Sequence, residues 1–557
     1  MKLSSEQSDQ LEQLCARVQV SAFAEAERAL DALETRRSPA LVPALLPAFV
    51  PEALRGRTQA QSWVSRVLGT LQPSTSNGVE EAFREKLAAF LARCLGQADA
   101  TDLVSLDEAC RRYGAPGWPT NHWRWLDVHA IEACLPTNQA SRFALIALAS
   151  FHGTGYVRER AIQLLDAETS GAELPFLLVR LNDWVDPVQR RAFRAVRARI
   201  RDDYAQHFAR WLELLVRLRE ARRNQLSDIV QWALTLLTSA VGRPHLEALF
   251  DAEGRQLRRS AFQLAGERFA GEARQAVLHK ALGDSDVGTR LWAARSTLES
   301  GLWFDEMDVD PCGAIRVWSL RARVARDEIA AIPTLRNALF DVAASVRASA
   351  RFHLSRSQPD LDVANLYRDA LDRLDDGAAR AIAISGLAEV GTRDDAALIS
   401  FLTSSQSAAV AKAAIRACAR LARQDCTREF LEALDDSRVG VSKAARIALT
   451  ETPLSATFLM DLVRRAVHTH ARLNALLLAN KLGRWDWLIA LLDAFHNDRE
   501  AIRSAARLAT DRWLSTALRS AYRPTPPARA QLEQIRTRLA RIPDLALRDR
   551  VEQAVEG

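Results

Sequence analysis

The sequence predicts an all-α protein, an α-solenoid (α-α superhelix) of about twelve short helical hairpins. A short residue pattern recurs about every 31 residues, and within each copy the apolar residues follow the spacing of a helix face. Length supports this prediction, because 557 residues exceed what one hydrophobic core usually serves, whereas a solenoid grows by adding units that pack only on their neighbours.

The recurring pattern is an aliphatic residue, often followed by Arg, then two variable residues, a small residue and an apolar residue four positions later. Eight of the eleven steps between successive small residues measure 30 to 33 residues, and the others measure 41, 28 and 26. The small residues are Ala161, Ala192, Ala233, Ala261, Ala293, Ser319, Ala350, Ala383, Ala414, Ala445, Ala475 and Ala506.

Each copy is predicted to be the second helix of a hairpin. Val346, Ala350 and Leu354 illustrate its apolar face, and the small middle residue allows another helix to approach closely. A second apolar segment, such as Leu174 to Leu181, precedes the turn, so each unit should be two antiparallel helices. Aspartates are expected at the N-cap or in the first turn, where a carboxylate accepts free N–H groups; these are Asp186, Asp286, Asp341, Asp376, Asp436 and Asp498.

The segment from Asp341 to Leu354, with Val346-Arg347 before Ala350, resembles the HEAT repeat, in its short variety of near thirty residues that is also found in phycobilisome-lyase-type proteins. The resemblance covers roughly residues 140 to 515 and implies an armadillo-like α-solenoid. It implies no single function, because HEAT arrays serve as scaffolds, transport receptors, DNA-repair folds and lyase subunits.

Three regions are expected along the chain. Residues 1 to 135 lack the pattern and should form an irregular helical cap or docking region, residues 136 to 515 the repeat array, and residues 516 to 557 Arg-rich capping helices. The 41-residue step between Ala192 and Ala233 predicts an elongated helix or an insertion.

Composition places the protein among cytoplasmic proteins. The first twenty residues lack a signal-peptide pattern, and no apolar segment is long enough to span a membrane. The seven cysteines are scattered without a C-x-x-C pair, as expected for buried thiols in a reducing compartment.

No catalytic or metal-binding motif is found: there is no P-loop, no G-x-S-x-G, no H-E-x-x-H and no zinc spacing. The sequence therefore favours a protein that is not an enzyme and binds no cofactor or metal. One polar and aromatic cluster remains, which reads either as an acid–base or ligand-clamping group or as a cap helix whose tryptophans plug the core; the second interpretation is favoured. Its residues are His122, Trp123, Arg124, Trp125, Asp127 and His129.

The arginine after the aliphatic residue recurs in eight units, and we expect most of these guanidinium groups to pair with turn aspartates in a ladder that stabilises stacking. They are Arg158, Arg258, Arg290, Arg316, Arg347, Arg380, Arg472 and Arg503. The net charge of +6 is modest, but residues 190 to 223 hold eleven arginines against four acidic residues, and the chain after Ser400 is also basic. This first basic run yields the candidate anion-binding residues Arg190, Arg194, Arg197, Arg201 and Arg217.

The residue immediately before the small one changes character along the chain. In the first half it is Arg160, Arg191, Trp232, Ser260, Trp292 and Trp318, large in all units but one. In the second half it is mostly small, with Ser349, Ile382, Ala413, Ala444, Asn474 and Ala505. Because Arg and Trp dominate binding hot spots, the five large residues are the candidate partner-binding strip. The alternative is that the tryptophans fill gaps between repeats.

These patterns predict a non-catalytic helical-repeat scaffold that binds a macromolecular partner, most simply a protein, along its concave face. The alternative is a HEAT-like protein that binds nucleic acid in an Arg-rich groove, with a role in DNA repair or defence.

Overall fold

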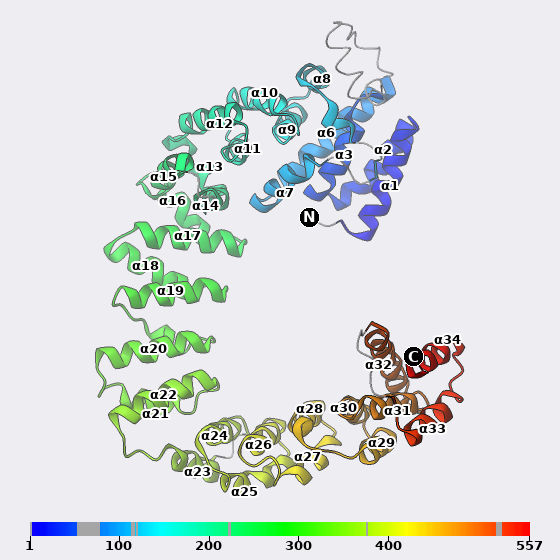
Figure 1. The fold of residues 1–557 in the computed structure, drawn as a ribbon. Coiled ribbons are helices and arrows are strands. Elements are labelled where there is room, and N and C mark those ends of the chain that lie inside the picture. Colours follow the sequence, from blue (N-terminus) through cyan, green and yellow to red (C-terminus); the bar gives the residue numbers. More distant parts are fainter. Residues whose placement is uncertain are drawn as a thin grey trace. The chain divides into compact units, whose positions relative to one another are not determined.

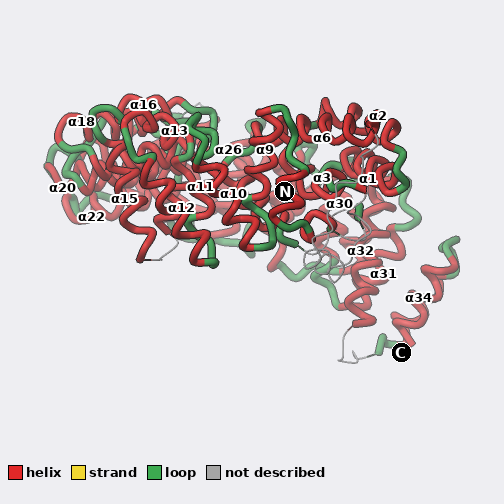
Figure 2. Tube along the Cα trace, turned by 90° about the horizontal axis from the view of Figure 1, so that it is seen from above, coloured by secondary structure: helices red, strands yellow, loops and turns green. Residues whose placement is uncertain are grey.

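The computed structural model describes residues 3–52, 78–112, 117–118, 121–220, 224–374, 377–519 and 526–556. Every regular element in these ranges is an α-helix or a 3-10 helix, and they contain no strand, so the predicted all-α fold is confirmed (Figures 1 and 2). Contacts between residues divide the chain into two units, Met1–Leu302 and Trp303–Gly557, a division that falls within the predicted repeat array.

The first unit begins with a non-repeat region and continues into helical hairpins. The non-repeat elements are α1 (Ser5–Gln19), α2 (Phe23–Leu33), η1 (Glu34–Arg36), η2 (Pro39–Leu41), α3 (Val42–Phe49), α6 (Gly78–Gly96), α7 (Ala100–Cys110), η3 (His122–Trp125) and α8 (Val128–Ala133). The hairpins comprise α9 (Gln139–Ala149), α10 (Gly155–Asp166), α11 (Leu174–Arg180), α12 (Asp186–Ala198), η4 (Asp202–Tyr204), α13 (Ala205–Arg210), α14 (Leu212–Glu220), α15 (Asn224–Thr238), α16 (Arg243–Ala248), η5 (Leu249–Asp251), α17 (Arg255–Arg268), α18 (Gly271–Leu282) and α19 (Val287–Glu299).

The second unit consists of hairpins and a closing pair of helices. Its elements are η6 (Asp305–Asp308), α20 (Gly313–Arg326), α21 (Ile332–Ala338), α22 (Ala344–Ser357), α23 (Val363–Arg373), α24 (Gly377–Val390), α25 (Asp395–Ser400), η7 (Phe401–Ser404), α26 (Ala408–Leu421), α27 (Thr427–Leu434), α28 (Val439–Ala448), η8 (Leu449–Glu451), α29 (Ala456–Arg465), α30 (Thr469–Ala479), α31 (Arg484–Ala494), α32 (Glu500–Arg519), α33 (Arg529–Leu539) and α34 (Leu545–Glu556).

The small residue lies on the second helix of each hairpin and is buried, as its role in close helix approach requires. Ala161, Ala350, Ala414 and Ala506 are at most 2% exposed. Within the first unit α10 contacts α12 and α17 contacts α19, and within the second unit α24 contacts α26 and α26 contacts α28, so these neighbouring hairpins pack on one another. Each unit therefore contains stacked helical hairpins of the predicted HEAT-like kind.

The irregular steps of the pattern have structural causes. In the 41-residue step, two short helices, α13 and α14, precede α15, so the prediction of one elongated helix is wrong and that of an insertion is correct. In the 26-residue step, the 3-10 turn η6 takes the place of a first helix. This shortest hairpin begins where the second unit begins.

Most of the predicted turn aspartates do not cap the second helix directly. Asp286 is the N-cap of α19 and accepts the Thr289 N–H, whereas Asp186 is the first residue of α12. Asp341 lies two residues before the N-cap of α22 and accepts the amide of that N-cap residue at 2.7 Å. Asp436 does the same before α28. Asp376 lies outside the described residues.

The predicted arginine ladder is present in part: Arg158, Arg258, Arg316 and Arg472 pair with turn aspartates, whereas Arg347 pairs with Glu389 and Arg503 with Glu500 of its own helix. Arg158 donates two hydrogen bonds to the turn carboxylate Asp183 of the next hairpin, at 2.8 and 3.0 Å, and Arg316 binds Asp341 in the same way. A third guanidinium N–H of Arg158 donates to the carbonyl of His152 in its own turn. The same arginine therefore fastens its own turn and the next one together.

In two of the hairpins that lack the ladder arginine, a residue from the following hairpin binds the turn. The ladder position is Ala411 in α26, and there the guanidinium of Arg438 reaches back to the carbonyls of Ser405 and Gln406, both at 2.8 Å. In α28 the ladder position is Ser442. The imidazole of His470 binds the Asp436 carbonyl of that turn at 2.8 Å.

Candidate partner-binding sites

The two arginines of the predicted Arg and Trp strip are tied into ion pairs. Arg160 of α10 donates its Nε–H to Glu132 of α8 at 2.6 Å, and Arg191 of α12 donates to Glu159 of α10 at 2.7 Å. Both guanidinium groups are roughly 40% exposed, so they reach solvent while they connect neighbouring elements.

The three tryptophans of the strip differ in burial. Trp232 is 43% exposed on α15. Trp292 is half-buried against α17, where a Cβ on Gly266 would lie 2.7 Å from the indole ring. Trp318, in the second unit, packs against the core of that unit. Among the three, Trp232 has the largest surface available to a partner.

Three of the five candidate anion-binding arginines form one stripe. Arg190, Arg194 and Arg197 are exposed, and their spacing of four and three residues places them on one side of α12. Arg201 is also exposed, but it follows the end of α12 in an extended backbone conformation. Arg217 lies on α14 and donates to the Thr101 hydroxyl of α7, which separates it from this stripe.

Pairing leaves two arginines of the stripe without a carboxylate. Arg190 pairs with Asp186, and Arg201 with Asp203 at 2.9 Å. No Asp or Glu within the described ranges pairs with Arg194 or Arg197. The Arg197 guanidinium lies 5.5 Å from the centre of the Trp232 ring, so the stripe includes an exposed aromatic face.

The cluster from His122 to His129 does not converge on a site. Trp123 is buried, and its carbonyl binds the imidazole of His152 at 2.9 Å. Asp127 is the N-cap of α8 and accepts the Ala130 N–H. His129 is exposed on the next turn. Trp123 is buried and Trp125 only partly so, and their segment is the 3-10 turn η3, which includes His122 and Arg124, and not a continuous cap helix.

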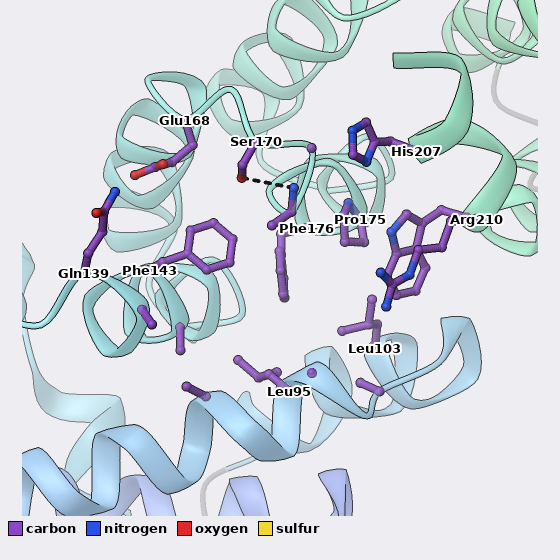
Figure 3. Close-up of a pocket in the computed structure, with 18 residues that line it drawn as sticks. Leu95, Leu103, Gln139, Phe143, Glu168, Ser170, Pro175, Phe176, His207 and Arg210 are labelled. Carbon is purple, nitrogen blue, oxygen red and sulfur yellow. Dashed lines mark hydrogen bonds between the residues drawn. The ribbon is translucent and has the colours of Figure 1, made fainter. Parts of the chain in front are cut away.

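A cavity of about 730 Å³ lies in the first unit, where the non-repeat helices α6 and α7 meet the hairpins (Figure 3). Its walls come from α6, α7, α9, α11 and α13 with the loops beside them, so several parts of the chain build one site. The apolar wall consists of Leu95, Leu103, Phe143, Phe176 and Trp211. The rings of Phe143 and Phe176 meet edge to face with centroids 6.1 Å apart.

Polar groups stand around this apolar wall. Figure 3 shows Gln139 and Glu168 on one side and His207 and Arg210 on the other. The loop between α10 and α11 fits against His207 through Gly171, which has a φ of +84°. A Cβ at Gly171 would lie 2.2 Å from the imidazole, so glycine is required both by the backbone conformation and by this close approach.

Two grooves lie on successive second helices of the second unit. The first, of about 440 Å³, is between α26 and α28 and is lined by Arg416, Ala419, Arg420, Arg423, Ala444, Ile447 and Ala448. The second, of about 700 Å³, is formed by α30, α31 and α32; its walls include Leu473, Leu477, Trp487, Ala505, Arg512 and Trp513. Each groove is lined by the small residue that precedes the repeat alanine, Ala444 in the first groove and Ala505 in the second.

Comparison with known proteins finds only distant structural likeness. No family model matches the sequence, and no curated protein matches it. Similar solved structures include Kap95p with RanGDP (12% identity, 90% of this chain, 72% of that chain, TM-score 0.36). They also include Kap121p bound to the extreme C-terminus of the phosphatase Cdc14p (12%, 97%, 64%, TM-score 0.31) and importin beta (11%, 95%, 87%, TM-score 0.28). Likeness at this level carries no information about partners.

The cavity and the grooves were not predicted from the sequence. The cavity combines α6 and α7, which lack the repeat pattern, with three hairpins, and no pattern within one hairpin indicates that contact. For the grooves a signal existed: the row of small residues from Ala413 to Ala505 leaves space where the first half has Arg and Trp. Large side chains at this position predict a binding strip in the first half of the chain, whereas small side chains at the same position line these two grooves.

Proposed function

We propose that this chain is a non-catalytic helical-repeat scaffold that binds a protein partner through its first unit. The observation that supports this function is the open apolar cavity between α6, α7 and the hairpins. Its volume falls in the range of sites that receive large side chains or drug-sized ligands.

The chemistry of the cavity suits an anchor segment of a protein. Aromatic walls such as Phe143, Phe176 and Trp211 are typical of pockets that receive hot-spot side chains. The rim residues Gln139 and Arg210 are exposed, so the segment can continue past the pocket and make polar contacts outside it.

A cross-linking experiment tests this proposal. A photo-reactive amino acid in place of Gln139 should capture a discrete polypeptide in cells of the source organism. Ala172→Trp should abolish the adduct, because Ala172 is an exposed wall residue and an indole there fills the cavity. Ala248→Trp, also at an exposed alanine but away from the cavity, should leave it unchanged. An adduct that persists in Ala172→Trp, or no polypeptide adduct, contradicts the proposal.

Nucleic-acid binding is the second candidate, and the stripe on α12 is the observation that favours it. Arg194, Arg197 and Trp232 offer two unpaired guanidinium groups beside an exposed ring, a combination suited to phosphates and bases. Retention on DNA should then fall steeply with salt, and Arg194→Glu with Arg197→Glu should reduce the salt slope by about two. Arg465→Glu, at an arginine 81% exposed on α29, is the control.

A further inference from the structure

The second unit carries a surface distinct from the cavity, which we call the α26–α32 face. It is made by equivalent positions on four successive second helices: two before, two after and six after the small residue. These positions hold Lys412, Arg416 and Arg420 on α26; Lys443, Ile447 and Glu451 on and after α28; Leu473, Leu477 and Lys481 on and after α30; and Ser504, Leu508 and Arg512 on α32.

A row of exposed apolar side chains crosses this face. Ile447, Leu477 and Leu508 are 53, 57 and 56% exposed, and all three stand two residues after the small residue of their helix. Because α28 contacts α30 and α30 contacts α32, equivalent positions on them lie side by side. Three large aliphatic side chains in one row are an apolar patch of the kind that marks an interaction site.

All but one of the charged residues of the face are cationic. The helices α26, α28 and α30 contain no Asp or Glu at all. No carboxylate in the described part of the chain pairs with the cations of the face, which are Lys412, Arg416, Arg420, Lys443, Lys481 and Arg512. The one acidic position, Glu451, pairs with Arg423 at the edge of the first groove. A partner must therefore supply the negative charge.

The geometry points to one occupant: we propose that the α26–α32 face docks an acidic amphipathic helix of a partner protein. Its apolar side would cover Ile447, Leu477 and Leu508, and its carboxylates would pair with Arg416 and Arg420. Helices pack about 10 Å apart, and a helix rises about 1.5 Å per residue. A partner helix crossing the row thus meets one aliphatic side chain about every seven residues.

Two other anionic partners fit less well. A nucleic-acid backbone would leave the apolar row facing phosphates and gain nothing from it. A membrane surface requires apolar side chains that protrude, whereas this face is hollowed by two grooves, of about 440 and 700 Å³. The α26–α32 face belongs to the second unit, and none of the observations on it involves the cavity of the first unit.

The test uses a defined probe and the full chain. The probe is a fluorescent 21-residue peptide of three heptads, with Leu at the first and fourth positions and Glu and Ala elsewhere. It should bind the protein saturably. Arg416→Glu with Arg420→Glu should weaken binding about tenfold or more, and so should Leu477→Asp. Val467→Asp, at a residue 69% exposed outside the face, and Arg465→Glu should leave it within about twofold.

Comparison ligands decide the class of partner. A peptide with Lys in place of Glu, poly-glutamate, a 20-nucleotide single strand and phosphatidylserine vesicles should each bind more weakly. Absence of binding by the acidic amphipathic peptide, or equal binding by any of these four, overturns the proposal. Circular dichroism melts of each variant establish that the fold is intact. Because these variants lie in the second unit and the Ala172→Trp plug in the first, either proposal can fail without the other.

Discussion

His152 links the N-terminal region to the first hairpin in a way that depends on its being uncharged. The ring is completely buried; its Nε2 lies 2.9 Å from the Trp123 carbonyl, and its Nδ1 accepts the Thr154 N–H at 3.0 Å. Burial, together with the nearby charges of Arg158 and Arg124, lowers the pKa of His152 to about 4.

This lowered pKa makes stability depend on pH in a defined window. The unfolded chain binds a proton near pH 6.5, whereas the folded chain binds it only near pH 4. A group with a depressed folded pKa contributes stability that is present above the unfolded value and is lost as pH falls. The loss from His152 should reach about 2 kcal/mol at pH 5 and about 3 kcal/mol at pH 4.

The variant His152→Gln isolates this contribution. Its side-chain amide can donate to the Trp123 carbonyl and accept from Thr154, but it does not titrate. The free energy of unfolding is measured by urea titration monitored by circular dichroism. Between pH 7.5 and pH 5, we expect it to fall by about 2 kcal/mol more for the wild type than for His152→Gln. His129→Gln, at an exposed histidine, should behave as wild type. If His152→Gln loses stability as steeply as wild type, the reasoning is refuted.

Two further predictions concern the repeat array. Asp183→Asn removes the carboxylate of a fully buried ladder pair and should lower the free energy of unfolding by about 3 to 5 kcal/mol. Asp425→Asn, at an exposed ion pair, should leave the melting temperature almost unchanged. Equal melting temperatures for the two variants would contradict the structural role of the ladder. Trp292→Ala should lower the free energy of unfolding by about 2 to 4 kcal/mol, because Trp292 packs on α17, and Trp232→Ala should lower it much less. If Trp232→Ala melts at the lower temperature, Trp292 is the more exposed residue.

The repeat architecture followed from the sequence because its physical causes are local. The period, the buried small residue and the ladder arginine each depend on contacts inside a hairpin or with the next one. Arg316 and Asp341, for example, are 25 residues apart, within one period. The exact capping contacts were harder to predict, because Asp341 lies two residues before the N-cap of α22 and a sequence alone does not fix where that helix begins.

The surfaces were harder to predict because exposure depends on how neighbouring hairpins pack. Trp292 and Trp232 occupy equivalent positions in the pattern, yet Trp292 packs against Gly266 of α17, whereas Trp232 is 43% exposed. In the same way, Arg158 and Arg194 count equally in the composition of the chain, but Arg158 is fully buried and Arg194 is exposed. Arginine content alone therefore overstates the charge available for binding.

A more useful measure of that charge subtracts the arginines that hold the array together. Arg158 and Arg316 are hydrogen-bonded within the ladder, and Arg438 binds the turn before α26, where the ladder arginine is missing. After this subtraction, unpaired cations remain both on the stripe on α12 and on the α26–α32 face. Only the second combines them with a row of exposed aliphatic side chains, since its small residues left room for grooves. That combination, and not the local density of arginine, distinguishes a protein-docking surface from a solvated basic helix.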